Sequence, residues 1–427
     1  MPKQRAAPMS ERDTLARHAA LDRRLVEAVR GIRVLAMLSW PATVQRRFLE
    51  RWRQGTARLP KIDYPKPDHG AARAALAAIA AEADPQHPVG DYIRRSADAW
   101  RLATDLLDAA GSAAILAPSV QLYGRPGHRI PGGEATNLDA ARHFVSLADE
   151  LDPALVGAGH GQAIAAETLR ADLQHELDAF FGRETIRVEV DPDLIAKAAA
   201  GATRIRLNAA TSFSASDRNQ LLQHEAFVHS LTALNGRNQP HLSSLGLNSP
   251  RITATQEGLA VFAELMTGSM DIGRMKRISL RIIAIDMALR GADFIEVFRF
   301  FLDAGQNETD SFSSAQRVFR GAPTSGGAAF TKDTVYLHGL LSVHTFFRWA
   351  LRHRRLDLGR NLFAGKLSLH DVLALQPCFA SGFIAAPTRL PPWIEQANGL
   401  AAMLAFSLFA NRIRLDHVQA EDLVLAL

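Results

Sequence analysis

The chain has 427 residues, of which 47% are hydrophobic and 22% charged, and its formal net charge is +5. These proportions are those of an ordinary globular protein with a substantial core. A single cysteine, Cys378, excludes an internal disulfide framework, and the first residues lack the apolar segment of a secretory signal. The long apolar stretch at residues 399–410 is too short to span a bilayer, so we expect a cytoplasmic protein without a membrane segment.

The N-terminal part of the chain is predicted to be helical. Residues 59–70 are rich in proline and lack periodicity, which indicates an extended connector. Residues 116–133 have the glycine and proline density of an irregular loop. The other segments of this part have helical patterns, with a stop near residues 39–43: 11–58, 70–83, 88–115, 135–151 and 163–181.

Two short segments alternate apolar and charged residues with the period of half-buried strands, at 185–190 and 204–208. Helical patterns return from residue 215, and 399–410 is interpreted as a buried core helix. Residues 422–427 fit either a helix or a strand. We therefore predict an α+β fold, predominantly helical, with a small sheet just before the helix described next.

Residues 212–236 have the start and stop signals of one helix, with serines at its beginning and Gly236 at its end. Its middle carries His224, Glu225 and His229 in the pattern H-E-x-x-x-H. Metallopeptidases use H-E-x-x-H, in which histidines four apart face one side and the glutamate is the general base. Five positions of a regular helix separate the two side chains by roughly 140°, so a shared ion requires a π-type bulge. Two hydrogen-bonded histidines on a helix surface remain the alternative.

A third ligand is expected downstream, because a zinc site of this kind uses three protein ligands and one open position. Thr253-x-x-Gln256 can form a capping box, which places Glu257 in the first turn of a second helix. Glu264, seven residues later, lies on nearly the same face and can orient a ligating histidine. This is the arrangement of glutamate-zincins. Glu257 could instead be a helix-dipole carboxylate, Glu264 an exposed glutamate, and His241 a rival third ligand.

Together "HEAFVH" and "QEGLA" resemble the QEGLA-motif, DUF1704-type family. Its bacterial members are called flavohaemoglobin-expression modulators, and its animal relatives include the microtubule-associated tyrosine carboxypeptidases, zinc enzymes that remove the C-terminal tyrosine of α-tubulin. The resemblance extends over about residues 60–400 through "RIRLN", "NGRNQP" and "GGAAFTKDTVYLHGL". It implies a zincin-like core in which His224, His229 and Glu257 hold zinc and Glu225 is catalytic. Family members usually have Gly-Thr before the second histidine, where this chain has Phe227-Val228.

The predicted chemistry is metal-assisted peptide hydrolysis with one zinc ion per chain. Zinc lowers the pKa of a bound water, and Glu225 takes the proton and delivers it to the leaving amine. Tyr336 is the candidate donor to the oxyanion, with an ordinary core tyrosine as the alternative. Arg237 and Lys332 are candidates to bind the substrate's terminal carboxylate, although both can be solvated surface cations.

The expected partner is the C-terminus of a peptide or protein, and the positive charge is compatible with an acidic tail. His338 and His344 are interpreted as structural histidines. The basic segments at 274–281 and 348–360 are interpreted as solvated helix faces, although they could attract nucleic acid. Two other functions therefore stay open: a catalytically inactive metal-binding regulator or scaffold, suggested by Phe227-Val228, and, less favoured, a nucleic-acid-binding regulator.

The predicted organisation has three parts. Residues 1–58 form an N-terminal helical segment, residues 59–400 a catalytic domain, and residues 401–427 a C-terminal segment. The lobes of the catalytic domain are expected to meet near residues 224–257, where the candidate ligands lie.

Overall fold

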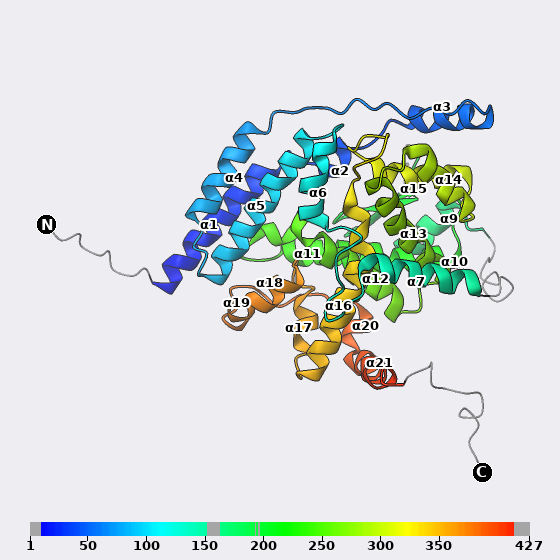
Figure 1. Cartoon of the computed structure of the whole chain (residues 1–427). Coiled ribbons are helices and arrows are strands. Elements are labelled where there is room, and N and C mark those ends of the chain that lie inside the picture. Colours follow the sequence, from blue (N-terminus) through cyan, green and yellow to red (C-terminus); the bar gives the residue numbers. More distant parts are fainter. Residues whose placement is uncertain (1–9, 152–162, 193, 195–196, 414–427) are drawn as a thin grey trace, which may run out of the picture.

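The computed structural model describes residues 10–151, 163–192, 194 and 197–413. Within these residues the chain is mostly helical and contains one small sheet, as predicted (Figure 1). None of the described helices combines the length and the apolar character that a membrane crossing requires.

The bounds of the helices before the sheet are α1 Glu11–Val29, α2 Val34–Met37, α3 Ala42–Arg53, α4 Gly70–Glu82, α5 Pro88–Asp108, α6 Leu116–Tyr123, α7 Asn137–Glu150 and α9 Ala166–Phe181. Those after the sheet are α10 Ala215–Leu221, η3 Leu222–Ser230, α11 Leu231–Arg237, α12 Thr253–Met266, α13 Ile272–Leu289, α14 Phe294–Asp303, α15 Glu308–Phe319, α16 Thr334–Arg352, α17 Asp357–Asn361, α18 Leu369–Ala374, α19 Gln376–Ala380, α20 Pro392–Glu395 and α21 Ala397–Ala410. Short 3₁₀ turns precede α6, α12 and α16, and another follows α11.

The helices that precede the predicted connector in the sequence pack in two different places. Helix α1 packs against α4 and α5. Trp40, just before α3, and Phe48, within α3, lie in a second core with the phenylalanines of α14 and α15. The connector between α3 and α4 is extended, as predicted, and runs along one edge of the molecule (Figure 1). Its Tyr64 hydroxyl accepts hydrogen bonds from the Trp40 indole at 2.7 Å and from the Gly321 amide at 2.8 Å. The predicted division at residue 58 stays a prediction.

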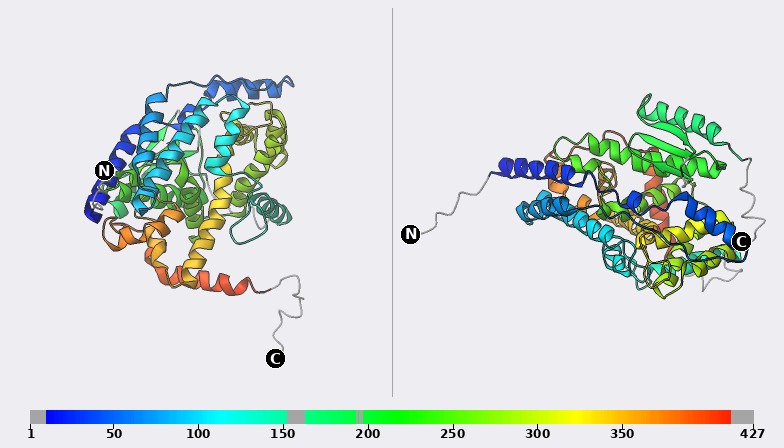
Figure 2. Two further views of the ribbon diagram at one scale, coloured as in Figure 1. Left: turned by 60° about the vertical axis from the view of Figure 1, so that its left-hand side comes forward. Right: turned by 90° about the horizontal axis from the view of Figure 1, so that it is seen from above.

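The sheet has the strand order β1-β3-β2, with β1 at Arg187–Asp191, β2 at Ala198–Ala200 and β3 at Arg204–Asn208. Strand β3 pairs in parallel with β1 and antiparallel with β2. Helix α9 packs against β1 and β3, and the η3 segment packs against β2 and β3, so the sheet supports the helix that carries the histidines (Figure 2). The sequence pattern missed β2 because three alanines show no alternation and alanine is uncommon in strands.

Helices α12 and α16 cross through a pair of glycines. A Cβ atom built on Gly258 would lie 2.2 Å from the carbonyl carbon of Gly339, and one built on Gly339 would lie 2.2 Å from the oxygen of Ala254. Only glycine permits backbones to approach this closely. The contact places the residue before Gly258, Glu257, beside the first turns of α16.

One predicted loop and one predicted burial were wrong. Residues 116–123 form helix α6 and not a loop, because Pro118 falls in the first turn, where a helix tolerates proline. Helix α21 forms as predicted but is not a core helix, since Phe406 is 75% exposed and Phe409 64%. It lies at the edge of the molecule and buries only the stripe of Leu400 and Leu404 (Figure 1). Residues 422–427 lie outside the described residues.

Candidate metal centre

The two histidines lie in a π-helical segment. Helix α10 begins with a capping box between Ser214 and Asp217 and continues without a break through η3 into α11. Because i→i+5 hydrogen bonding aligns residues five apart, His224 and His229 come to the same side, with ring centroids 4.8 Å apart. The predicted π-type bulge is confirmed, and it extends over nine residues. Phe227 occupies a position where the family that the sequence resembles usually has glycine. Its ring packs edge-on against that of Phe180 in α9, with ring centroids 4.7 Å apart.

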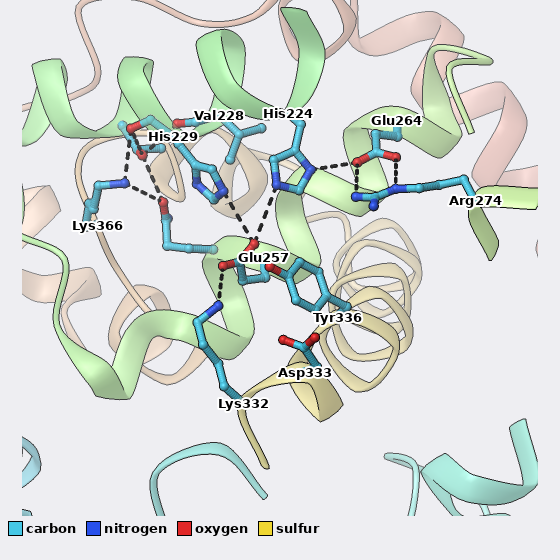
Figure 3. A network of polar contacts seen from close by, with 12 residues as sticks. His224, Val228, His229, Glu257, Glu264, Arg274, Lys332, Asp333, Tyr336 and Lys366 are labelled. Carbon is cyan, nitrogen blue, oxygen red and sulfur yellow. Dashed lines mark hydrogen bonds and ion pairs between the residues drawn. The ribbon is translucent and has the colours of Figure 1, made fainter. Parts of the chain in front are cut away.

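Glu257 of α12 completes a cluster with the two histidines (Figure 3). Its Oε2 atom lies 3.5 Å from Nε2 of His224 and 3.6 Å from Nε2 of His229. Two ligands that are each about 2.1 Å from one tetrahedral ion are separated by about 3.4 Å, so both spacings fit a shared cation. The three side chains can therefore hold a metal ion, with one coordination position left for a water or substrate.

Glu264 fixes the orientation of His224 through a hydrogen bond to Nδ1, the ring nitrogen that does not face Glu257. This Nδ1 lies 2.6 Å from Oε1 of the fully buried Glu264, which in turn accepts two hydrogen bonds from Arg274 of α13 at 3.2 Å. With Nδ1–H donating to the Glu264 carboxylate, Nε2 is the nitrogen that faces Glu257 and is left to bind a metal ion. Burial opposes charge on His224, but hydrogen bonds to Glu257 and Glu264 outweigh it and raise its pKa well above the usual value.

Glu257 is oriented by a buried cation. Lys332 donates from Nζ to Oε1 of Glu257 at 2.8 Å, which leaves Oε2 directed at the histidines. Burial favours the neutral acid, but Lys332 and the two imidazoles outweigh it, so the pKa of Glu257 lies well below its ordinary value. Burial lowers the pKa of His229, and a nearby charge on His224 would lower it further. A metal ion binds the negative carboxylate and the neutral form of each imidazole, so binding at this cluster would release the proton from His224.

The carbonyl groups of the π-helix have partners from outside the helix backbone. The Thr232 hydroxyl donates to the carbonyl of Val228 at 2.7 Å, and Nζ of Lys366 donates to the carbonyl of His229 at 3.0 Å. Lys366 also donates to the side-chain oxygen of Gln256 at 3.2 Å, and the Thr232 hydroxyl lies 2.9 Å from the same oxygen. Burial lowers the pKa of Lys366 to about 8. These contacts satisfy backbone groups next to His229 that a distorted helix would otherwise leave exposed.

Lys366 is brought to the helix by the "NGRNQ" segment. The Asn235 amide donates to the carbonyl of Phe363 at 2.7 Å, and the Gln239 amide donates to the carbonyl of Ala364 at 2.9 Å. A Cβ atom on Gly236 would lie 2.0 Å from the oxygen of Leu245, so this turn requires glycine. The segment therefore fixes the backbone that carries Lys366.

The family model described as microtubule-associated tyrosine carboxypeptidase matches residues 46–412. The chain belongs to this family. Compared with curated proteins, the chain has no sequence match. A crystal structure from Colwellia psychrerythraea, described as a lipoprotein, is 14% identical with a TM-score of 0.39, and the similarity covers 94% of this chain and 77% of that one.

The other candidate residues of this tyrosine carboxypeptidase family member lie at different distances from the cluster. Glu225 is half-buried on η3, next to His224, and no hydrogen bond to its carboxylate is present among the described residues. Tyr336 lies in the first turn of α16, and its ring lies beside Glu257 and Asp333 (Figure 3). Arg237 is exposed at the end of α11, roughly 12 Å of helix rise beyond His229.

One local interpretation was wrong, and one alternative is not supported. Gln256 contacts Thr232 and Lys366, so Thr253 forms no capping box and Glu257 falls beyond the first turn of α12. His241 stacks on Phe383 at 4.7 Å and is not part of the cluster.

The segment 274–281 is not a solvated face. Arg274 and Arg281 have side chains only 13% and 18% exposed, and they lie against Glu264 and Asp333. The segment at 348–360 is largely exposed from Arg352 on, as predicted.

Sequence reasoning missed the residues whose role depends on the fold. Lys366 and Arg274 are basic residues whose acidic or carbonyl partners lie elsewhere in the sequence. Arg317 of α15 donates to both oxygens of Asp333, at 2.5 and 2.7 Å, and lies 3.4 Å from the Tyr336 hydroxyl. One signal was available for Lys366, which is a single lysine in the otherwise apolar run "LFAGKLSL".

Proposed function

We propose that the chain is a zinc-dependent metallopeptidase of zincin-like type that acts on the C-terminus of a peptide or protein. The observation that carries the proposal is the convergence of His224, His229 and Glu257 on one point in a member of a carboxypeptidase family. Nitrogen and carboxylate ligands with one open position are the donor set of catalytic zinc. Zinc bound there supplies an activated water at neutral pH and polarises a carbonyl group.

Glu225 is the proposed general base. It follows the first ligand directly and is half-buried, and its carboxylate is not used by any hydrogen bond among the described residues, so it is available to take a proton from water. It would then deliver that proton to the amine that leaves. A base of this kind contributes roughly 10²- to 10⁴-fold to the rate.

Tyr336 is the proposed hydrogen-bond donor to the oxyanion. Arg317 lies 3.4 Å from its hydroxyl oxygen and can donate to that oxygen, so the hydroxyl hydrogen stays available for a substrate. Lys332 lies 5.1 Å from the centroid of the Tyr336 ring and further restrains it. A donor fixed in this way can stabilise developing negative charge without reorganising.

The test combines metal analysis with peptide hydrolysis. Full-length protein without a tag would be analysed by elemental mass spectrometry beside His229→Ala, Glu257→Ala and Glu225→Gln. We expect one zinc per chain in the wild type and in Glu225→Gln, and loss of zinc in the other two variants. Peptides with varied C-termini should be cleaved by the wild type and at least 100-fold more slowly by Glu225→Gln. Wild-type protein that contains no zinc and does not bind added zinc would contradict the proposal.

A catalytically inactive regulator is the second candidate, because Phe227-Val228 departs from the family pattern before the second ligand. It predicts the same metal content but no hydrolysis of any peptide. The same assay therefore separates the two functions.

A further inference from the structure

Among the described residues, five cations lie around Tyr336, and three of them are neutralised by carboxylates. Lys332 pairs with Glu257, Arg274 with Glu264, and Arg317 with Asp333. The remaining two are Arg281 of α13 and Arg320, at the end of α15. The group therefore carries two positive charges more than these three acids can balance.

Arg281 and Arg320 lack the contacts that buried guanidinium groups normally have. No hydrogen bond to either group is present among the described residues, and Nε of each is buried without a partner. Nε of Arg281 lies 3.7 Å from Asp333, but that carboxylate already accepts two hydrogen bonds from Arg317. An arginine presents five donors, so both groups retain unused hydrogen-bonding capacity.

Burial and neighbouring positive charge act together on this pair. Burial, and secondly the charge on Arg317, lower the pKa of Arg281 to about 10 and that of Arg320 to about 10. The two groups lie near one carboxylate: Arg281 is 3.7 Å from Asp333, which pairs with Arg317, and Arg320 is the C-cap residue of α15, three positions after Arg317. A bound anion would offset the repulsion and use the free donors.

The position of Arg281 and Arg320 suits the C-terminal carboxylate of a peptide. The atoms of one residue span about 3.8 Å, so the terminal carboxylate of a substrate lies within one residue of the bond that is cut. Tyr336 lies between the cluster and the arginines. Its ring is next to Lys332, which pairs with Glu257, and its hydroxyl is next to Arg317. The side chains of Arg281 and Arg317 are 18% and 24% exposed, so the two groups are largely but not completely buried.

We propose that Arg281 and Arg320 bind the terminal carboxylate of the substrate. This inference rests on the proposed peptidase function. It replaces Arg237, which is exposed at the far end of α11, and Lys332, which is engaged with Glu257. Arginine suits the task because its planar fork binds a carboxylate with two parallel hydrogen bonds.

Binding would be measured by fluorescence anisotropy with full-length zinc-loaded Glu225→Gln protein, so that no peptide is cut. Three labelled pentapeptides would be compared: one with a free C-terminal acid, its C-terminal amide, and an amide that contains one glutamate. We expect the acid to bind about 10- to 100-fold more tightly than the plain amide. Adding Arg281→Gln or Arg320→Gln should remove most of this preference.

Two further variants serve as controls. Arg290→Gln removes one positive charge from the same helix at a position that is 70% exposed, and it should keep the full preference. Arg281→Lys keeps the charge without the fork and should keep part of it. Unchanged zinc content in each variant shows that the site is still folded.

The inference is wrong if acid and amide bind equally, or if the preference survives both glutamine variants. It is also wrong if the glutamate-containing amide matches the acid, because the cations then bind an acidic side chain. Wild-type protein that cuts acid and amide peptides at equal rates would contradict the inference and leave peptide hydrolysis in place. Wild-type protein that cuts no peptide but prefers the free acid would contradict the function and support the carboxylate site.

Discussion

Glu264 shows how a single buried residue can orient a candidate metal ligand without belonging to the ligand set. It is completely buried between Nδ1 of His224 and the guanidinium of Arg274. Burial would raise its pKa, but Arg274 and His224 lower it, so the carboxylate stays charged and fixes the His224 tautomer. A neutral amide of the same shape cannot serve both neighbours equally.

We expect Glu264→Gln to weaken zinc binding by roughly 10- to 100-fold, the range found for partners of metal-binding histidines. Zinc affinity would be measured by competition with a chromogenic chelator. Glu27→Gln, which changes a carboxylate that is 69% exposed, is the matched control and should bind zinc like the wild type. Equal affinities in all three proteins would show that Glu264 does not orient His224.

At the scale of residues, the sequence predicts the cluster better than its surroundings. His224, His229, Glu257 and Glu264 follow from spacing along two helices, and the structure brings all four together. Lys366 does not follow, because no local pattern reveals that a lysine will be buried against a carbonyl group far away in the sequence. Long-range partners of this kind are determined by the packing of the whole fold.

At the scale of elements, the π-helix is the feature that brings two histidines five residues apart, His224 and His229, to the same side of the helix. A π-helix has less favourable hydrogen bonding than an α-helix and persists where its surroundings stabilise it. Here Thr232 and Lys366 occupy the carbonyls of Val228 and His229, and Phe227 packs on α9. The sequence could predict that a distortion was needed but not which residues would maintain it.

Replacing Lys366 by methionine should therefore weaken zinc binding about tenfold by releasing the carbonyl of His229. The fold should survive, since methionine has similar length and avoids the cost of burying a charge. Lys276→Met removes a lysine that pairs with Asp149 at the surface and is the control. The chelator competition assay reports both affinities. If Lys366→Met binds zinc as tightly as the control, the π-helix does not depend on this contact.

The crossing of α12 and α16 supports a prediction about stability. Gly258→Ala would place a methyl group 2.2 Å from the backbone of Gly339, and we expect a loss of about 1–3 kcal/mol or more in the free energy of unfolding. Gly399→Ala, in α21, meets no atom within 4 Å and should be neutral or stabilising by up to about 1 kcal/mol. Denaturant unfolding measures both. Equal effects would show that the helices can separate to admit the methyl group.

The capping-box error has its origin in the packing of α12 on the π-helix. Thr253 and Gln256 have the spacing of a cap, but Gln256 contacts Thr232 and Lys366 where these two elements meet. Local spacing predicts what a side chain can do, and tertiary packing decides between the options.

At the scale of the whole molecule, the cluster of His224, His229 and Glu257 joins elements that are far apart in the sequence. The histidines come from η3, which lies on the sheet, and Glu257 comes from α12, which crosses α16. The sequence predicted the helical class and the small sheet, but it placed α21 in the core. An apolar run predicts a helix, whereas its depth depends on how many neighbours cover it, and α21 has neighbours along one stripe only.

Because the cluster links these elements, zinc should stabilise the folded chain by mass action. Free zinc at 100 times its dissociation constant adds about 2.7 kcal/mol to the free energy of unfolding. At roughly 2 °C or less per kcal/mol for a chain of this size, the midpoint should rise by a few degrees. Differential scanning calorimetry of chelator-treated wild-type protein with and without added zinc measures the shift.

Glu257→Ala distinguishes binding at the cluster from weak binding elsewhere. It removes the carboxylate that faces both histidines, so the zinc-dependent rise in midpoint should disappear, whereas Glu27→Ala, at the surface, should keep it. A rise of equal size in Glu257→Ala would mean that zinc stabilises the protein from another position. Because an ion bound only to the folded state must shift its unfolding, a wild type that shows no rise at saturating zinc would contradict a metal centre at these three residues.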